Sequence, residues 1–524
     1  MTLVTIQGAS KWATDYLGKE VRPTNISYLV QYGKVKKLGE NGSTLIDLND
    51  LKKYYESWHG KREVHWKKKL GDDLNWALSF DHLREKDTTK HVHRLHPYKG
   101  KFIPQLVQYF IDDHTDDFKT DVYFKKGDVV LDPFCGSGTT LVQASEMGIH
   151  SLGIDISHFN CMMSDVKLQR YDFNSLQQEI NRIKKTITGY EHDNSIVAFE
   201  NELMQKMYEF NHEHFPSPGF KYQLQQRKID ESTFAEEKEK KFLKVYGRLV
   251  KKHGVELKQA QTENFLDKWY CRNVRKEIDF GFERIKEIKD IRNKKALAVI
   301  LSRTIRSCRA TTHSDLATLK EPQLTTYYCW KHKKICKPLY SIKYWFERYA
   351  SDTLLRLQEF DRLRTPAHFT VLPFDSRTVD IIAETKKRNK TLHELLKKEK
   401  IRGIFTSPPY VGQINYHEQH AYAYDLFGFD RKDDLEIGPL YKGQGLEARR
   451  SYVGGIADVL NNCKKYLQDN YDIFLVANDK YNVYPEIAEK SGMKIVNMFK
   501  RPVLNRTERD RNPYSEIIFH FKSQ

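Results

Sequence analysis

The residues from Ser407 to Tyr410 place a hydroxyl, two prolines and an aromatic ring directly after an apolar run, in the order IFTSPPY. Proline lacks a backbone N–H and restricts the residue before it, so this stretch can neither continue a strand nor open an ordinary helix. It is predicted to form a stiff, extended turn that displays the Ser407 hydroxyl, two carbonyls and the Tyr410 ring. Acceptors held on such a turn can be aimed in advance at developing positive charge, which costs no reorganisation during a reaction.

A glycine-rich turn lies far upstream, in the segment VVLDPFCGSGTT. A short buried strand is predicted to end at Asp132, Gly136 and Gly138 then lead into a helix, and the next strand ends at Asp155. Glycines at such a turn let the backbone approach a ligand closely, and a helix N-terminus offers free N–H groups. An acidic side chain at the end of the second strand can accept hydrogen bonds from ribose hydroxyls.

The acidic residue before the glycines distinguishes this turn from a dinucleotide-binding fingerprint, which has a third glycine and no preceding acid. Asp132 would repel a pyrophosphate but suits an ammonium group. A ligand with an amine, a carboxylate and an adenosine fits these residues better, which predicts S-adenosylmethionine as the cofactor. The alternative is a structural strand-to-helix turn with incidental glycines.

Four motifs together resemble those of the DNA amino-methyltransferases, which modify cytosine N4 or adenine N6. DPFCGSGTT is similar to their cofactor loop, and TSPPY is similar to their catalytic motif in the form common among cytosine-N4 enzymes. HPYKGKFIPQLVQYFI resembles the segment that closes over the methionine end of the cofactor, and VLPFDSR resembles the third motif, in which Asp375 would approach the adenine of the cofactor. The resemblance implies a set of cofactor-binding residues, namely His96, Tyr98, Lys99, Phe102, Asp132, Phe134, Gly136, Gly138, Thr139, Thr140, Asp155, Ile156, Asp375 and Ser376.

The resemblance also implies roles for the catalytic motif, Ser407, Pro408, Pro409 and Tyr410. An exocyclic base amine is a poor nucleophile, because its lone pair is delocalised into the ring. The Ser407 hydroxyl and the Pro408 carbonyl would hold the amine hydrogens while the nitrogen pyramidalises. Tyr410 would stack on the target base once that base has flipped out of the duplex.

The fold that the resemblance implies is α/β, a Rossmann-like class I methyltransferase sheet that is mostly parallel and seven-stranded. The matching motifs cover about 91–160 and 366–524, whereas charged amphipathic helical segments dominate 165–360. The order of cofactor segment, cofactor loop, long insert and catalytic motif resembles the alpha group, whose target-recognition region lies in that insert. The Ser-Pro-Pro-Tyr form makes cytosine N4 the expected target. That form is more usual in the group with the reverse order, and this departure keeps adenine N6 open as the alternative.

Residues 9–58 are predicted to form a small domain of helix, helix, basic hairpin and helix. The first helix spans 10–17, the second begins near Ile26 and ends at Gly33, the hairpin turns at Asn41-Gly42, and Asn49 caps the third helix. This arrangement resembles the winged helix-turn-helix of excisionase-like and MerR-like DNA-binding modules. The alternative is a helical packing domain that makes no DNA contact.

Composition agrees with a cytoplasmic enzyme that binds nucleic acid. A formal net charge of +17 favours a polyanionic partner such as nucleic acid, and the alternative is a merely basic soluble protein. The partner that the resemblance implies is double-stranded DNA. We find no run of apolar residues long enough to span a membrane, no secretory signal, and no disulfide pattern among the seven cysteines. We divide the chain into a DNA-binding domain (1–66), the first part of the methyltransferase core (67–160), a helical insertion (161–365) and the second part of the core (366–524). A cognate restriction endonuclease is a further expected partner, and a DNA-binding regulator with an inactive core is the alternative from another class of protein.

Several polar residues near these motifs allow two interpretations. Cys135 in the glycine loop is expected to pack rather than to act as a nucleophile. Residues 416–420 include polar side chains that either line the base pocket or form the solvated face of a helix, and the arginine-rich tail either contacts phosphates or is a solvated loop. These residues are Tyr416, His417, Glu418 and His420, and Arg501, Arg506, Arg509 and Arg511.

A cysteine- and histidine-containing region lies in the insertion, at Cys308, His313, Cys329, His332 and Cys336. Structural zinc favours paired cysteines at short spacing, and Cys-x2-His-x3-Cys is not a standard pair, although it could supply three ligands. We favour packed cysteines beside a basic, DNA-facing surface and predict no metal site.

Overall fold

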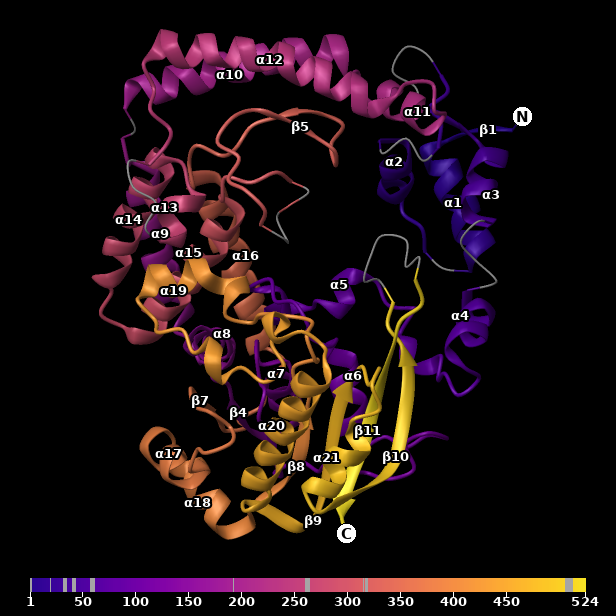
Figure 1. The fold of residues 1–524 in the computed structure, drawn as a ribbon, viewed down its shortest axis with the longest axis vertical. Coiled ribbons are helices and arrows are strands. Elements are labelled where there is room, and N and C mark those ends of the chain that lie inside the picture. Colours follow the sequence, from indigo (N-terminus) through magenta and orange to yellow (C-terminus); the bar gives the residue numbers. More distant parts are fainter. Residues whose placement is uncertain are drawn as a thin grey trace. The chain divides into compact units, whose positions relative to one another are not determined.

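The computed structural model describes residues 2–18, 20–31, 35–39, 44–56, 62–191, 193–259, 264–313, 315, 319–504 and 512–524. The chain forms two compact units (Figure 1). Unit 1 comprises Met1–His65, Tyr190–Glu277 and Ser307–Ser341, and unit 2 comprises Trp66–Gly189, Ile278–Arg306 and Ile342–Gln524. The segment expected to be one insertion, 161–365, thus contributes to both units.

Unit 2 is built around a seven-stranded sheet with the strand order β10-β11-β9-β8-β3-β4-β7. The five strands from β9 to β7 run parallel, and β11 pairs antiparallel with both β9 and β10. The mostly parallel seven-stranded sheet expected from the sequence is confirmed. The strands are β3 (Val129–Asp132), β4 (His150–Ile154), β7 (Phe369–Leu372), β8 (Ile401–Thr406), β9 (Leu467–Ala477), β10 (Met493–Pro502) and β11 (Ser515–Ser523).

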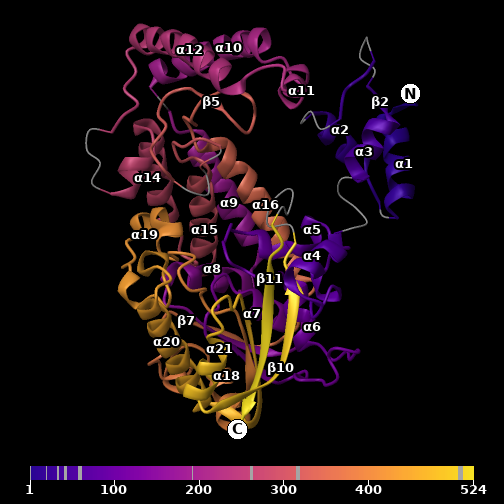
Figure 2. The ribbon, with the colours of Figure 1, turned by 45° about the vertical axis from the view of Figure 1, so that its right-hand side comes forward.

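Both faces of the sheet are covered, which is why its central strands read as continuous apolar runs (Figure 2). Along β3, Val129 and Leu131 point into one core, shared with α17, α18, α20 and α21. Val130 points into the other core, which α6 and α7 cover. These helices are α6 (Pro104–Ile111), α7 (Thr139–Met147), α17 (Ile381–Arg388), α18 (Lys390–Glu399), α20 (Leu446–Lys464) and α21 (Tyr484–Lys490).

The remaining helices of unit 2 precede the sheet or interrupt it, and α9 packs along α16. Two helices, α4 and α14, cross the boundaries between the units, and α15 ends at one. No helix among the described residues is long and apolar enough to cross a membrane. The bounds are α4 (Arg62–Leu70), α5 (Glu85–Thr88), α8 (His158–Leu168), α9 (Phe173–Thr188), α14 (Arg272–Lys286), α15 (Ile291–Ser307), α16 (Lys343–Asp361) and α19 (Ala421–Phe427), with short 3₁₀ helices at Ala77–Ser79, His91–Arg94, Glu418–His420, Asp433–Leu435 and Leu440–Lys442.

The N-terminal part of unit 1 contains the three predicted helices, α1 (Ile6–Leu17), α2 (Pro23–Gln31) and α3 (Leu48–Glu56), around a small apolar core. Two short strands that pair antiparallel, β1 (Leu3–Thr5) and β2 (Leu45–Asp47), accompany them. The predicted turn at Asn41-Gly42 and the predicted helix end at Gly33 lie outside the described residues. Asn49 as N-cap is wrong, because α3 begins at Leu48 and the Asp47 carboxylate accepts the Asn49 N–H at 3.0 Å. A winged helix-turn-helix in contact with DNA stays a prediction.

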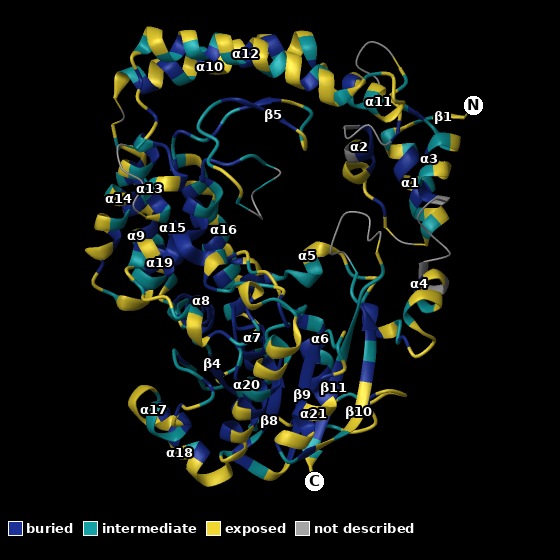
Figure 3. Cartoon of the chain, viewed as in Figure 1, coloured by how far each residue is buried: buried dark blue, intermediate teal, exposed yellow. Residues whose placement is uncertain are grey.

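The rest of unit 1 is mainly helical, and α10 packs against α12, with exposed residues along both helices (Figure 3). A two-stranded antiparallel hairpin, β5 (Tyr327–Cys329) and β6 (Lys334–Cys336), contacts α12 through β5 and α10 through β6. The helices are α10 (Asn194–His214), α11 (Gly219–Gln225), α12 (Glu231–His253) and α13 (Phe265–Trp269).

Candidate functional site

The candidate site of unit 2 lies where four parallel strands end. Asp132 is the last residue of β3, Asp155 directly follows β4, Asp375 follows β7 and Ser407 directly follows β8. Because β4, β3 and β8 are neighbours in the sheet and run in the same direction, their carboxyl ends meet at one edge. Ligands of open α/β sheets bind in the crevice at that edge, where the strand order reverses.

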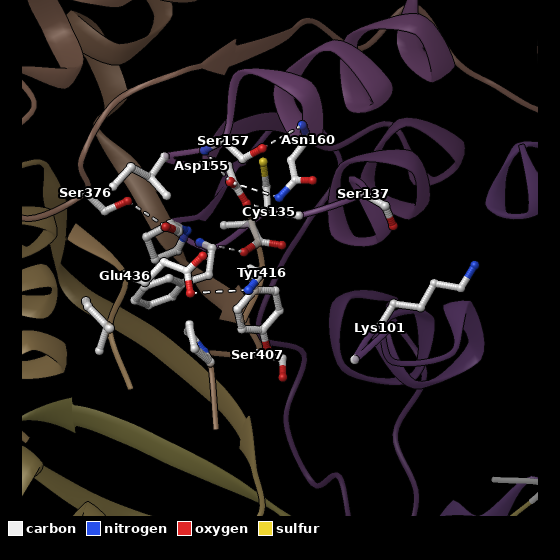
Figure 4. Close-up of a pocket in the computed structure, with 18 of the residues that line it drawn as sticks. Lys101, Cys135, Ser137, Asp155, Ser157, Asn160, Ser376, Ser407, Tyr416 and Glu436 are labelled. Carbon is white, nitrogen blue, oxygen red and sulfur yellow. Dashed lines mark hydrogen bonds between the residues drawn. The ribbon is translucent and has the colours of Figure 1, made fainter. Parts of the chain in front are cut away.

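A cavity of about 880 Å³, including its open mouth, occupies this edge (Figure 4). The walls combine apolar groups with three carboxylates from the strand ends. Of the predicted residues, the cavity is lined by Tyr98, Phe102, Asp132, Phe134, Gly136, Thr139, Asp155, Ile156, Asp375, Ser376, Ser407 and Pro409.

The Asp155 carboxylate is held by three donors at the cavity wall. Its Oδ2 accepts the Gly136 N–H at 2.9 Å, and its Oδ1 accepts the Ser157 N–H at 2.8 Å and the Asn160 amide at 3.1 Å. Burial raises the pKa of Asp155, while these hydrogen bonds oppose the rise. The carboxylate is therefore fixed in position, with lone pairs left for a ligand.

Asp132 is buried, at 2% exposure, and is hydrogen-bonded to the last residue of β8. The Thr406 hydroxyl donates to its Oδ1 at 2.6 Å, and the Phe134 N–H donates to the same oxygen at 3.2 Å. Burial raises the pKa of Asp132 to about 6. A carboxylate with so little solvent around it gains strongly from a cationic ligand.

The glycine turn needs its glycines for two reasons. Gly136 has φ +47°, and a Cβ there would lie 2.8 Å from the Tyr98 hydroxyl. Gly138 has φ +77° as the N-cap of α7, and a Cβ there would lie 2.7 Å from the Ser164 hydroxyl. Both positions combine a left-handed backbone with a close neighbouring side chain. Glycine at 136 leaves room for the Tyr98 ring, and glycine at 138 leaves room for Ser164.

In the turn after β8, Ser407 and Pro409 line the cavity and Pro408 is buried. Tyr410 does not line the cavity. Its ring packs against the apolar core and its hydroxyl donates to Glu516 Oε1 at 2.8 Å. Burial, and then the nearby Glu516 charge, raise the pKa of Tyr410 well above its usual value.

The third motif reaches the cavity with its acid already paired. Arg377 Nε donates to both Asp375 oxygens, at 2.9 and 3.0 Å, and Nη2 donates to Oδ2 at 2.6 Å. The Ser376 hydroxyl donates to the Pro133 carbonyl at 2.6 Å. These bonds fix the loop after β7 against the glycine turn.

Four other predicted residues lie near the cavity without lining it. His96 is buried, with Nε2 at 3.3 Å from the Tyr422 hydroxyl, and the Lys99 N–H donates to Gln419 at 3.2 Å. The Thr140 hydroxyl donates to the Phe405 carbonyl at 3.2 Å, which links α7 to β8. Gly138 begins α7. These residues support the walls.

The loops that close the cavity contain several residues that motif matching did not assign to the cofactor. Of the four residues left open at 416–420, Tyr416 and His417 line the cavity, whereas the exposed Glu418 and the buried His420 do not. Glu436 also lines it and accepts the backbone N–H groups of Tyr416 and His417 at 3.2 and 2.7 Å. His417 also pairs with Glu436 through its ring. Asn160 lies three residues beyond the Ser157 N-cap of α8, and Lys101 lies inside the predicted closing segment, so position beside a motif was the available signal. Glu436 has no such signal.

Two groups of residues left open by the sequence are also placed. Arg501 is buried in β10, with Nη1 at 3.6 Å from Glu516, so it is not a loop arginine, and Arg506, Arg509 and Arg511 lie outside the described residues. In unit 1, ligand atoms of His313, Cys329, His332 and Cys336 gather within 4.8 Å of one another. Cys308 is buried and is not in this group.

The family model for the N6/N4 methyltransferases, described as DNA methylase, matches residues 23–166. The type II methyltransferase M.MjaII of Methanocaldococcus jannaschii is 47% identical over 526 residues, which cover 100% of this chain and 97% of that protein.

Two further relatives match over shorter stretches. The type II methyltransferase M.MvaI of Kocuria varians is 35% identical over 120 residues, 23% of this chain and 24% of that protein. The type II methyltransferase M.BsoBI of Geobacillus stearothermophilus is 35% identical over 96 residues, 18% of this chain and 17% of that protein.

Proposed function

Because the chain belongs to the type II DNA amino-methyltransferases, the family that modifies cytosine N4 or adenine N6, we propose that it transfers a methyl group from S-adenosylmethionine to the N4 amine of cytosine in double-stranded DNA. The observation that carries this proposal is that Ser407 opens onto the same cavity as Asp132 and Asp155. A hydrogen-bond acceptor for an amine thus lies beside two carboxylates suited to an adenosylated amino acid.

The residues around the glycine turn fit such a cofactor. The three fixed donors of Asp155 leave lone pairs that could accept ribose hydroxyls, and buried Asp132 suits an ammonium group. Apolar groups from separate loops, among them Phe134, Ile156 and Ile437, line the cavity and could face an adenine. Type II methyltransferases generally use S-adenosylmethionine, and the cavity offers groups suited to its ribose, ammonium and adenine parts.

When bound, the cofactor supplies a sulfonium methyl that carries its own activation, so the chain contributes position and electrostatics. We assign the Ser407 hydroxyl and the Pro408 carbonyl to the two hydrogens of the target amine. Pro408 and Pro409 stiffen the turn, so the acceptors need no reorganisation as positive charge develops on nitrogen. Tight placement of nitrogen against methyl then lowers the entropic barrier to transfer.

The target base must leave the duplex to reach the end of β8, because its amine is otherwise paired inside the helix. Tyr410 is the proposed stacking partner for the flipped base, and its bond to Glu516 would hold the ring while the base enters. Tyr416, which lines the cavity from the next loop, offers a second aromatic wall.

The choice of cytosine rests on the Ser-Pro-Pro-Tyr form of the catalytic motif. We further propose that residues 1–66 form a winged helix-turn-helix that contacts DNA, and that the insertion at 161–365 reads the target sequence. The net charge of +17 supports a large DNA footprint. A cognate restriction endonuclease would act on the same sequence when it is unmethylated.

Methylation of plasmid DNA with labelled S-adenosylmethionine tests the proposal. After digestion to nucleosides, we expect the label in N4-methylcytosine. Label in N6-methyladenine would contradict the choice of base while leaving the family assignment intact. Cofactor bound without transfer to any DNA would instead support a regulator with an inactive core.

A further inference from the structure

The β5–β6 hairpin of unit 1 holds a group of side chains that the methyltransferase reaction does not use. We propose that His313, Cys329, His332 and Cys336, here called the hairpin cluster, bind one structural Zn²⁺ ion. This site goes beyond the proposed function and revises the sequence prediction of no metal. Two thiols and two imidazoles are a donor set that zinc prefers.

Distances within the hairpin cluster match a tetrahedral zinc site. The four ligand atoms all lie within 4.8 Å of one another. The Cys329 sulfur lies 3.6 Å from His313 Nδ1, and the Cys336 sulfur lies 3.7 Å from His332 Nδ1. With Zn–S near 2.3 Å and Zn–N near 2.0–2.1 Å, the sulfur–nitrogen edge of a tetrahedron is about 3.5 Å. A small inward adjustment of the outer atoms would complete the coordination.

The hairpin backbone places both thiols on one side. Tyr327 pairs with Cys336 and Cys329 pairs with Lys334, so Cys329 and Cys336 lie diagonally on the same face. Between the strands, the His332 N–H donates to the Cys329 sulfur at 3.4 Å. A backbone N–H directed at sulfur stabilises the thiolate form, which is the form that binds metal.

The turn is shaped to return the chain past Cys329. Lys333 adopts a left-handed conformation, φ +58°, and its N–H donates to the Cys329 carbonyl at 2.6 Å. A non-glycine residue with that φ is uncommon and marks a backbone held by its surroundings. His332 is thereby brought beside the thiol that it follows in sequence.

The fourth ligand comes from a different segment, which is why local spacing predicted only three. His313 lies in the loop that follows α15, and its Nδ1, which is 2.8 Å from the Tyr327 hydroxyl, would exchange that hydrogen bond for the ion. Its ring lies 4.4 Å from the His332 ring, centroid to centroid. An ion here would therefore tie the loop after α15 to the hairpin.

The hairpin is small, and its contacts outside the cluster are to α10 and α12, including an ion pair between Lys333 at the tip and Glu231 of α12. Each strand has three residues, and the associated apolar core consists of Tyr327, Cys329 and Cys336. A two-stranded hairpin alone is marginally stable in water. Asn211 of α10 anchors the β6 side through two hydrogen bonds with Ile335, at 2.9 and 3.0 Å, and Glu231 of α12 accepts a 3.1 Å hydrogen bond from Tyr328. The ion would add a link between the hairpin and the loop after α15.

Metal content of the full chain tests the site directly. The protein is purified without a metal-affinity step and its metals are measured by mass spectrometry. We expect about one zinc ion per chain that survives gel filtration in a weak chelator. We expect Cys329→Ser and Cys336→Ser to lose this zinc, whereas Cys308→Ala and His212→Ala should retain it, because Cys308 lies outside the cluster and His212 is exposed on α10.

Cobalt replacement keeps the test valid if the serine variants fail to fold. Wild-type protein stripped of metal and reloaded with Co²⁺ should show the intense visible bands of tetrahedral cobalt with thiolate ligands. Wild-type protein that contains no stoichiometric zinc and shows no such bands would overturn the site. A Cys329–Cys336 disulfide, detected as the loss of two hydrogens in the intact mass under non-reducing conditions, would overturn it as well.

Discussion

The cavity of unit 2 and the hairpin cluster of unit 1 gather polar groups in opposite ways. The cavity takes residues from strands far apart in sequence, and the hydrogen bonds of a seven-stranded sheet fix those strand ends whether or not a ligand is bound. The hairpin cluster takes residues from one stretch, 313–336, held by two three-residue strands and a small core. Substitutions in the cavity should therefore change chemistry more than folding, and substitutions in the hairpin cluster should do the reverse.

The largest effect that separates the two regions is expected for Ser407→Ala. Loss of the acceptor at the end of β8 should lower kcat about 100-fold, the scale found when one preorganised hydrogen-bonding group is removed from a transition state. Cofactor Kd and the free energy of unfolding should stay close to wild type, because Ser407 is partly exposed at the cavity and follows the strand. Single-turnover methylation and calorimetric binding measure the first two quantities, and urea unfolding measures the third.

The matched control for Ser407 is Ser451→Ala, an exposed position on α20 that should match wild type in both assays. A Ser407→Ala enzyme with normal kcat and weakened cofactor binding would contradict the assigned role. It would also weaken the contrast between the regions, because Ser407 would then serve the cofactor rather than the amine.

Asp155→Ala should act one step earlier, on cofactor binding. Loss of the hydrogen bonds from the ribose hydroxyls to this charged acceptor should cost about 2 kcal/mol of binding free energy, which corresponds to a roughly 30-fold rise in cofactor Kd. The substitution also leaves the N–H groups of Gly136 and Ser157 without their partner, so some loss of stability accompanies it. Equilibrium binding of labelled cofactor measures the change, and Asp117→Ala at an exposed position is the control. Unchanged affinity would exclude Asp155 from the ribose site.

The sequence predicts a region well when the residues of that region lie close together in the chain. Strand, acid, glycine turn and helix are consecutive in the chain, so the positions of Asp132, Gly136 and Asp155 could be read directly, and the parallel sheet brought them together with Ser407. Glu436 could not be predicted, because a loop far from any motif brings it under the N–H groups of Tyr416 and His417.

The outcome for Tyr410 and the metal ligands shows the same limit. The sequence placed Tyr410 on the catalytic turn but gave no sign of Glu516, which bonds its hydroxyl from β11. The Cys-x2-His-x3-Cys spacing supplies only three of the four ligands, because His313 comes from the loop after α15. A local pattern predicts the residues that one segment contributes to a site. The partners that reach this site from other segments depend on long-range contacts in the fold.

Removal of the zinc ion by a chelator should affect unit 1 and leave the cavity of unit 2 unchanged. If the hairpin cluster binds zinc and unit 1 helps to read the target, removal of the metal should weaken binding to the cognate duplex about tenfold, comparable to losing one or two good base contacts. Cofactor Kd should not change, because the cavity lies within unit 2. Fluorescence anisotropy on labelled duplex, before and after zinc is restored, measures the loss and its recovery. Equal weakening of cofactor binding would show that the two regions depend on each other.

The smallest expected effect is a pH dependence of cofactor affinity that arises from Asp132. Burial raises its pKa from the ordinary 3.8 to about 6, so the carboxyl becomes neutral as pH falls through 6 and no longer attracts an ammonium group. Between pH 7.5 and 5.5 we expect cofactor Kd to rise about threefold to fivefold, as expected for loss of the charged form below its pKa. Asp132→Asn should bind more weakly and show a flatter profile over this range.

The stability of the cofactor-free protein should follow pH in the opposite direction. Between 3.8 and about 6 the folded chain binds the Asp132 proton more tightly than the unfolded chain does, so this residue's contribution to the free energy of unfolding is fully present below pH 3.8 and is lost as pH rises through 6. Urea unfolding of wild type and Asp132→Asn at several pH values isolates this contribution as the difference between the two curves. If cofactor affinity and the free energy of unfolding changed in the same direction with pH, a group other than Asp132 would be responsible for the pH dependence of cofactor binding.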